Sequence, residues 1–183
     1  MIQIKNAAEL QKMRKACAIS AAALKAGGEA IEPGITTAEI DKIIYDFIVR
    51  HGARPNFLHL YGFPATACIS VNDTVIHGIP TRQQQIRPGD IVSIDTGCKI
   101  DGFNGDNACT YGCGKLDLEA QRLLDVTKES LHRGIEMARG GNRVGDIGHA
   151  VQSYVEENGF SVVRSFVGHG VGTVSYTHLR AHE

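Results

Sequence analysis

The stretch RPGDIVSIDTGCKIDGFNGDNA, residues 87–108, decides the fold class of this chain. Its Pro88-Gly89 pair occupies the two central positions at which a type II turn favours proline and glycine. Residues 91–97 and 103–111 are typical of strands, and Asp101-Gly102 between them is a signal for a tight hairpin turn. The stretch therefore predicts an antiparallel hairpin in which residue 95 pairs with 108 and residue 97 pairs with 106.

Two aspartates of this hairpin are the first candidates for chemistry. Asp95 lies in an otherwise apolar strand, where aspartate is rare and an unpaired buried carboxylate is costly. In the predicted register Asp106 is its diagonal neighbour on the same face, with the two backbones about 7–8 Å apart. Two carboxylates on one face either share a proton or bind cations between them. The structural alternative is one solvent-facing aspartate and one turn aspartate.

Helices are expected on both sides of the hairpin in the sequence, which makes the fold class α/β in the mixed (α+β) sense. The first helix should end at Gly27-Gly28, and the second begins with a capping box formed by Thr36 and Glu39. A short apolar strand is expected over 161–167. The four expected helices cover residues 6–26, 36–52, about 116–139 and about 144–157.

A second hairpin is predicted upstream, where residues 67–71 and 74–77 alternate around Asn72-Asp73. A two-residue loop there would place His77 opposite Cys68, with both side chains on one face. A Cys–His nucleophile pair is one interpretation of that placement. A small packing residue is the other interpretation of Cys68, because free cysteine is commonly buried.

His169 stands between Gly168 and Gly170, so the backbone there can approach another group closely. The GHGVG segment lacks the G-x-G-x-x-G spacing of a dinucleotide loop. Each histidine taken singly is more often a structural residue than a ligand. Taken together, Asp95, Asp106, His77 and His169 form a mixed oxygen and nitrogen set suited to Mn²⁺, Fe²⁺, Co²⁺ or Zn²⁺.

One internal similarity appears at an offset of 107 residues, between residues 33–52 and residues 140–159. It suggests a duplicated unit of two helices followed by strands. The alternative is that two amphipathic helices align by chance. The matched positions are Gly27 with Gly134, Glu39 with Asp146, Ile40 with Ile147, Ile44 with Val151, Phe47 with Tyr154 and Ile48 with Val155.

Composition narrows the class of protein. The 183 residues carry 19 Lys and Arg against 20 Asp and Glu, so the net charge of −1 argues against a nucleic-acid or anionic-membrane surface. The five cysteines are odd in number and contain no C-x-x-C pair, which favours a reduced, cytoplasmic protein. No stretch has the length and apolarity of a membrane span or signal peptide.

Four motifs together resemble the type I methionine aminopeptidases of the M24 metallopeptidase family. They are NDTVIHGIP (72–80), RPGDIVSIDTG (87–97), DGFNGDNA (101–108) and GHGVG (168–172), and the likeness runs from about residue 2 to residue 172. That family has the pita-bread fold, two pseudo-symmetric α/β halves around a dinuclear metal site. The resemblance implies a peptidase domain over 1–172, with a first half at 1–111 and a partial second half at 112–172. Residues 173–183 then form a tail that looks non-native.

The resemblance also implies roles for individual residues. Asp95 looks like the carboxylate that chelates one metal ion, Asp106 like the carboxylate that bridges both, and His169 like the imidazole ligand of the second ion. His77 looks like the catalytic histidine that hydrogen-bonds the substrate near the scissile bond. The pocket for the methionine side chain would be lined by Phe57, Leu60, Phe63 and Cys68.

The implied reaction is hydrolysis of the first peptide bond of a nascent protein, which removes its N-terminal methionine. Two divalent metal ions, Co, Mn, Fe or Zn, are the implied cofactors. The implied setting is a cytoplasmic monomer that acts on nascent polypeptides near the ribosome, without binding nucleic acid or membrane.

The sequence departs from this family after Gly172. The family has a second histidine there and two glutamates farther on, one of which is the general base. Here Tyr176 stands at the histidine position, and His178 is two residues out of register. We therefore expect the polypeptide as written to be an inactive or nearly inactive fragment. A non-catalytic binding module of the same fold and a prolidase-like dipeptidase stay open as alternatives.

Overall fold

The computed structural model describes residues 4–165 and 168–174. These residues fall into two compact units: residues 4–116 with 170–174, and residues 117–165 with 168–169. Within the described ranges, none of the helices combines the length and the apolar character that crossing a bilayer requires.

The first unit contains an antiparallel sheet centred on β3 (Ile91–Ile100). Strand β4 (Phe103–Gly112) pairs along the whole of β3, while β2 (Ala67–Val71) and the short β1 (Arg54–Pro55) pair with successive parts of β3. Asp95 is opposite Ala108 and Gly97 is opposite Asp106, so the predicted hairpin register is confirmed. Its turn residues Asp101 and Gly102 both have positive φ.

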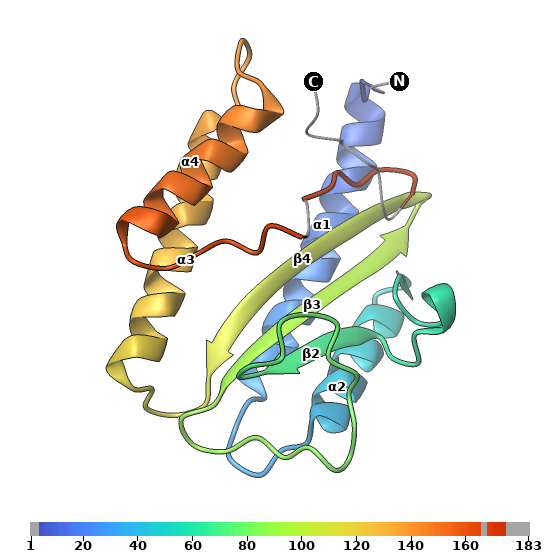
Figure 1. Cartoon of the computed structure of the whole chain (residues 1–183). Helices are drawn as coiled ribbons and strands as arrows, with labels where there is room; N and C mark the ends of the chain where they lie inside the picture. The colour runs from blue at the N-terminus through green and yellow to red at the C-terminus, as the bar shows by residue number, and fades with distance from the viewer. Residues whose placement is uncertain (1–3, 166–167, 175–183) are drawn as a thin grey trace. The chain divides into compact units, whose positions relative to one another are not determined.

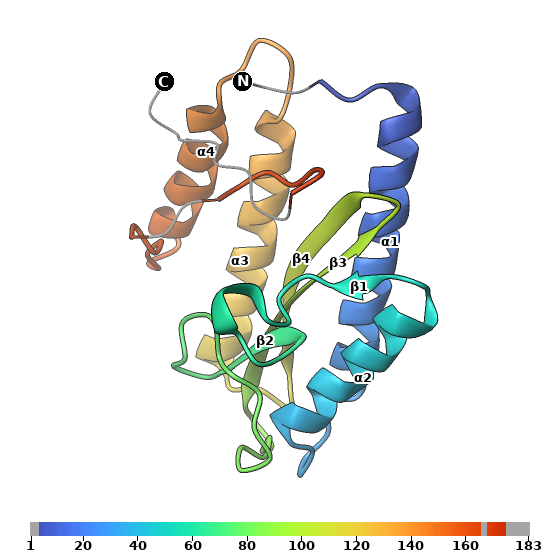
Figure 2. The same cartoon turned by 90° about the vertical axis from the view of Figure 1, so that its right-hand side faces the viewer.

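Two helices, α1 (Ala7–Glu29) and α2 (Thr37–Arg50), cover one face of this sheet, as Figures 1 and 2 show. Ile40, Ile44 and Ile48 of α2 are fully buried and belong to the same core as the alternate β3 residues Val92 and Ile94. The predicted capping box at the start of α2 is confirmed. Removing this apolar surface from water provides the main driving force that joins helices and sheet.

The prediction that the first helix ends at Gly27-Gly28 is wrong, because α1 continues to Glu29. These glycines serve close packing. A Cβ at Gly27 would lie 2.7 Å from the Ile44 side chain, and one at Gly28 would lie 2.2 Å from the Tyr111 ring. A residue with a side chain would push α1 away from α2 and from β4.

The second unit contains two consecutive helices, α3 (Leu118–Met137) and α4 (Val144–Glu157), which pack on each other. A Cβ at Gly134 would lie 2.9 Å from the Val151 side chain. Gly134 and Val151 are the residues that align with Gly27 and Ile44 across the 107-residue offset. A Cβ at Gly27 would also lie 3.5 Å from the Ile40 side chain, and a Cβ at Gly134 would lie 3.5 Å from the Ile147 side chain. Ile40 and Ile147 are aligned across the same offset. The two helix pairs therefore pack through equivalent residues, as a duplicated unit should.

Two predicted strands are absent from the described residues. Residues 161–165 form no strand, and residues 166–167 lie outside the described ranges, as do residues 175–183 of the predicted tail. Residues 74–77 do not pair with β2, so the second predicted hairpin is wrong. The backbone N–H of Ile69 instead donates to the Gly78 carbonyl at 2.9 Å, which places the returning chain beside β2 without a regular ladder.

Candidate active site

The two faces of the β2–β3–β4 sheet differ in chemistry. On β3, Val92, Ile94, Thr96 and Cys98 are buried beneath the helices, so Asp95 belongs to the opposite face. Directly opposite residues of antiparallel strands share a face. Cys68 of β2 is opposite Asp95 and therefore joins it on this face, which we call the carboxylate face.

Asp106 belongs to the carboxylate face as well, because its partner Gly97 lies two residues beyond Asp95. The two carboxylate-bearing residues are diagonal neighbours on adjacent strands, about 7–8 Å apart at the backbone. Both are partly exposed. Gly97 contributes no side chain between them, and a Cβ there would lie 3.0 Å from the Gly105 carbonyl oxygen.

Cys68 is a buried thiol beside the two aspartates. Its side chain is 6% exposed. Burial, together with the negative charges of Asp95, Asp106 and Asp41, raises the pKa of the Cys68 thiol to about 12. At neutral pH only about one thiol in 10⁵ would be ionised. The interpretation of Cys68 as a nucleophile is therefore disfavoured, and a packing residue that forms one wall of the site fits its surroundings.

His77 does not lie opposite Cys68, because the hairpin on which that prediction depended does not form. It is exposed, has a φ of 57°, and lies in the segment that returns beside β2. The next residue fixes this segment: Gly78 N–H donates to Ser70 Oγ at 3.1 Å, and its carbonyl accepts from Ile69. A Cβ at Gly78 would lie 2.2 Å from the Ile69 carbonyl oxygen, so only glycine allows this approach.

The predicted pocket residues Phe57, Leu60 and Phe63 lie on one compact loop that precedes β2. Leu60 N–H donates to the Phe57 carbonyl at 2.9 Å, and Phe63 N–H donates to the Leu60 carbonyl at 2.9 Å. Leu60 begins a single 3-10 turn, η1 (Leu60–Gly62). The left-handed backbone of His59 and Tyr61 gives the loop its tight path. Phe57 and Phe63 are half-buried and Leu60 is exposed.

Asn56 is a residue on the carboxylate face that sequence reasoning missed. Its backbone N–H donates to the Gly97 carbonyl at 2.9 Å, and its side chain lies against Gly97. The Asn56 Nδ2 atom is buried without a hydrogen-bond partner among the described residues. A buried donor without a partner costs about 1–3 kcal/mol. No sequence pattern indicated Asn56, because its place depends on the β1–β3 pairing.

His169 belongs to the second unit and is exposed. The segment that directly follows it, residues 170–174, belongs to the first unit. There the carbonyl oxygen of Gly172 accepts both the backbone N–H and the side-chain amide of Asn104, each at 2.9 Å. Lys99 Nζ donates to the Thr173 carbonyl at 3.0 Å. Asn104 and Lys99 are opposite each other on the carboxylate face, so this end of the hairpin anchors the glycine segment.

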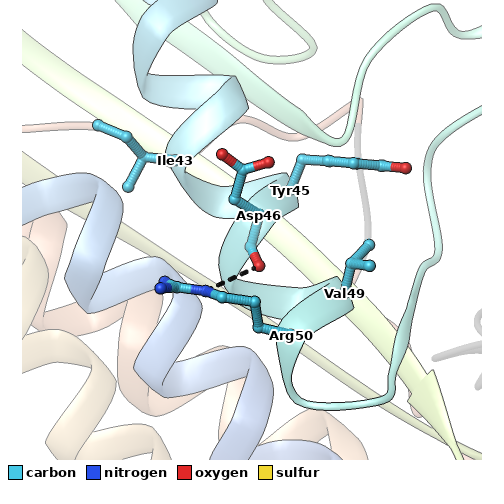
Figure 3. Close-up of a pocket in the computed structure, with 5 residues that line it drawn as sticks. All are labelled: Ile43, Tyr45, Asp46, Val49 and Arg50. Atoms are coloured by element: carbon cyan, nitrogen blue, oxygen red, sulfur yellow. Dashed lines mark hydrogen bonds between the residues drawn. The ribbon is translucent and has the colours of Figure 1, made fainter.

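Two hollows on the surface of the first unit lie elsewhere. One, of about 410 Å³, is lined by Ile43, Tyr45, Asp46, Val49 and Arg50, all from the outer side of α2. Figure 3 shows these side chains projecting from that single helix, with Arg50 Nε donating to the Asp46 carbonyl at 3.3 Å. None of the candidate residues lines it, so it is no part of the candidate site.

The donor atoms of the carboxylate face suit a divalent metal ion in part. Carboxylate oxygens suit Mn²⁺, Fe²⁺, Co²⁺ and Zn²⁺, and two aspartates on adjacent strands supply them from a rigid support. In residues 4–165 and 168–174, no three His, Cys, Asp or Glu side chains converge into one metal-binding group. The described sheet thus contributes two carboxylates whose chemistry fits a divalent metal ion.

Comparison with known proteins defines the class to which this fold and site belong. The family model of metallopeptidase family M24 matches residues 11–182. The chain therefore belongs to this family, whose members are metallopeptidases.

Several relatives that share 38–52% sequence identity with the chain are methionine aminopeptidases. The chain is 52% identical to a methionine aminopeptidase of Clostridium perfringens over 172 residues, which are 94% of this chain and 69% of the relative. It is 45% identical to methionine aminopeptidase 1 of Bacillus subtilis over the same fractions. The crystal structure of methionine aminopeptidase from Thermotoga maritima superposes with a TM-score of 0.95 at 38% identity, covering 97% of this chain and 72% of that chain. These relatives confirm the predicted pita-bread fold.

Proposed function

We propose that the site carried by this chain belongs to the reaction of the methionine aminopeptidases that it resembles, removal of the N-terminal methionine from nascent polypeptides, and that the polypeptide as written is inactive or nearly so. One observation carries the proposal: Asp95 and Asp106 lie diagonally on one face, and Cys68 lies directly opposite Asp95. A pair of carboxylates beside an apolar, sulfur-bearing wall suits a metal-dependent site for a thioether side chain. The proposed setting is the cytoplasm, where nascent chains emerge.

Each residue has a distinct task in this proposal. Asp95 and Asp106, with His169 as the third candidate ligand, would hold two divalent ions. Such ions, when bound, polarise a carbonyl group and lower the pKa of water. His77 would hydrogen-bond the substrate beside the scissile peptide bond. Its side chain is exposed, and the next residue, Gly78, is hydrogen-bonded to β2 through both its N–H and its carbonyl group.

The substrate side chain would contact a separate part of the first unit. Phe57, Leu60 and Phe63 on the loop before β2, together with Cys68 on β2, would enclose the methionine side chain. The side chain of Cys68 is buried, so it can supply an apolar wall for the methionine side chain. Binding there would exclude water and orient the first peptide bond toward the carboxylate face.

A prolidase-like dipeptidase is the second candidate, because the fold also superposes on the prolidase of Pyrococcus furiosus with a TM-score of 0.82. At 24% identity that likeness shows the fold alone. The substrate distinguishes the two candidates: Met-Ala-Ser for the aminopeptidase and a Met-Pro dipeptide for the prolidase-like enzyme. A non-catalytic binding module would hydrolyse neither peptide.

The proposal is tested with a chimera that joins residues 1–172 to the part of the Clostridium perfringens relative beyond the matched region. With Mn²⁺ or Co²⁺, the chimera should hydrolyse Met-Ala-Ser. Asp95→Asn and Asp106→Asn should each lower kcat/KM by more than about 100-fold, the upper range seen for residues that only support metal ligands. Asp101→Asn is the matched control, because Asp101 pairs with Lys15 at the exposed hairpin turn. Cleavage of Met-Pro alone, or full activity of Asp95→Asn, would refute the proposal.

A further inference from the structure

Asp41 is a partly buried acidic residue on α2 that the proposed chemistry does not use. Its Oδ1 atom accepts the backbone N–H of Thr66 at 2.9 Å and that of Ala67 at 2.8 Å. Burial raises the pKa of this carboxyl group above its ordinary value, and the two hydrogen bonds partly oppose that rise. A carboxylate removed from water in this way needs a compensating interaction, and the start of β2 supplies it.

The edge of β2 explains why these N–H groups need an acceptor. Along an antiparallel strand, successive N–H groups point alternately toward the two neighbouring edges. The N–H of Ile69 points away from β3 and donates to the Gly78 carbonyl, so the N–H of Ala67 points to the same open edge. Asp41 therefore accepts the hydrogen bond of the first N–H group on this open edge of β2.

The position of this edge contact matters for the proposed methionine pocket. Cys68 directly follows Ala67 and is opposite Asp95. Thr66 ends the segment that begins with the Phe57–Phe63 loop. The Oδ1 atom of Asp41 thus binds the junction between the Phe57–Phe63 segment and β2. This junction lies between the pocket residues proposed on the loop and Cys68 on β2.

We propose that Asp41 is a positioning residue for the wall of the methionine pocket. By binding the start of β2, Asp41 holds Cys68 in place opposite Asp95. The proposal deepens the proposed function and depends on it for the identity of the substrate side chain. The contact itself is independent of that identity. Hydrogen bonds to an ionised acceptor are shorter and stronger than those between neutral groups, so a carboxylate can hold two N–H groups through one oxygen.

A purely structural tie between α2 and the sheet is already present without Asp41. Ile40, Ile44 and Ile48 of α2 are fully buried in the core of the first unit. Loss of the carboxylate should therefore loosen the start of β2 locally, while the helix stays packed on the sheet. This difference separates a positioning role from a general role in stability.

The test uses the full 183-residue chain and compares Asp41→Ala, Asp41→Asn and the control Asp46→Ala. Asp46 lies five residues along the same helix and forms an exposed ion pair with Lys42. Two readouts are measured on the native protein: amide hydrogen exchange at Thr66 and Ala67, and the rate at which iodoacetamide alkylates Cys68. Neither readout involves peptide hydrolysis. A negative result in these readouts would therefore overturn the role of Asp41, whereas the proposed function is tested separately by the chimera assay.

Asp41→Ala should accelerate both readouts by about tenfold or more, as expected when hydrogen bonds to a charged group are removed from a local opening equilibrium. Asp41→Asn, which keeps an oxygen acceptor, should restore most of the hydrogen-exchange protection at Thr66 and Ala67, and Asp46→Ala should match wild type in both readouts. Unchanged Cys68 alkylation in Asp41→Ala, or equally fast amide exchange at Thr66 and Ala67 in Asp41→Ala and Asp41→Asn, would overturn the proposal.

A second measurement applies if Asp41→Ala fails to fold. Replacing the carboxylate by the weaker amide acceptor in Asp41→Asn should move the amide proton resonances of Thr66 and Ala67 upfield, because charge-assisted hydrogen bonds are the stronger ones. The amide resonance of Ile69, which donates to Gly78, is the internal reference and should not move. If the Thr66 and Ala67 resonances stay in place as well, the proposed role is wrong.

Discussion

Gly105→Ala would test how closely α1 approaches β4 beside Asp106. A Cβ at residue 105 would lie 2.5 Å from the Ala16 carbonyl oxygen, 2.6 Å from its carbonyl carbon and 2.7 Å from the Cys17 nitrogen. Ordinary van der Waals contact begins at 3.4 Å, so helix and strand would have to separate by about 0.9 Å to relieve the contact with the Ala16 oxygen. All three atoms belong to the helix backbone, so no side-chain rotation can relieve the contact.

The magnitude follows from two opposing effects. Overpacking of a close-packed interior costs about 1–3 kcal/mol. Alanine recovers roughly 0.5–1 kcal/mol of the conformational entropy that glycine loses on folding. From the midpoints of these ranges the net loss should be about 1.3 kcal/mol, which corresponds to a fall in Tm of about 3–5 °C for a chain of this length.

Thermal unfolding followed by circular dichroism provides the assay, with Gly148→Ala as the control. Gly148 lies within α4, and a Cβ there would meet no atom within 4 Å. The control should therefore gain about 0.5–1 kcal/mol from the replacement of a helical glycine. If Gly105→Ala unfolds at or above the wild-type temperature while Gly148→Ala behaves as expected, the close approach of α1 and β4 is refuted.

Three further predictions concern packing, thiols and pH. Gly27→Ala and Gly134→Ala should each lower Tm, because the new Cβ would lie 2.7 Å and 2.9 Å from a packed side chain; a loss in only one would contradict equivalent packing. Native titration with a thiol reagent should modify the exposed Cys17 and Cys109 rapidly, and a third fast thiol would contradict the burial of the others. The raised pKa of Asp41 means that the folded state binds its proton more tightly, so the free energy of unfolding should fall as pH rises from 3.8 through the raised value. Urea unfolding across that range should show a smaller fall for Asp41→Asn, and equal slopes would argue against the assignment.

Local sequence signals were sufficient for the hairpin that bears the carboxylates. A two-residue Asp-Gly turn has few accessible geometries, and it sets the register of the strands that it connects. Because side chains alternate across a strand, this register alone puts Asp95 and Asp106 on one face. The capping box at Thr36 was equally local, since its donors and acceptors lie within three residues.

Two errors have a common cause in contacts between distant residues. Gly27 and Gly28 have the low helix propensity that favours an end, yet contacts with α2 and β4 retain the helix. The segment after β2 has an alternating pattern, yet the close approach of Gly78 to Ile69 takes the place of a ladder. Propensity is worth about 1 kcal/mol per residue, and tertiary packing can exceed it.

The sequence by itself determined the family resemblance, the hairpin register and the placement of Asp95 and Asp106 on one face, because each depends on short segments or on motifs read in order. Only the tertiary structure decided which face of the sheet the helices cover, how Cys68 comes to lie opposite Asp95, and that Asp41 holds the start of β2. These features join residues that are 25 or more positions apart, and their geometry arises only when the chain packs its core.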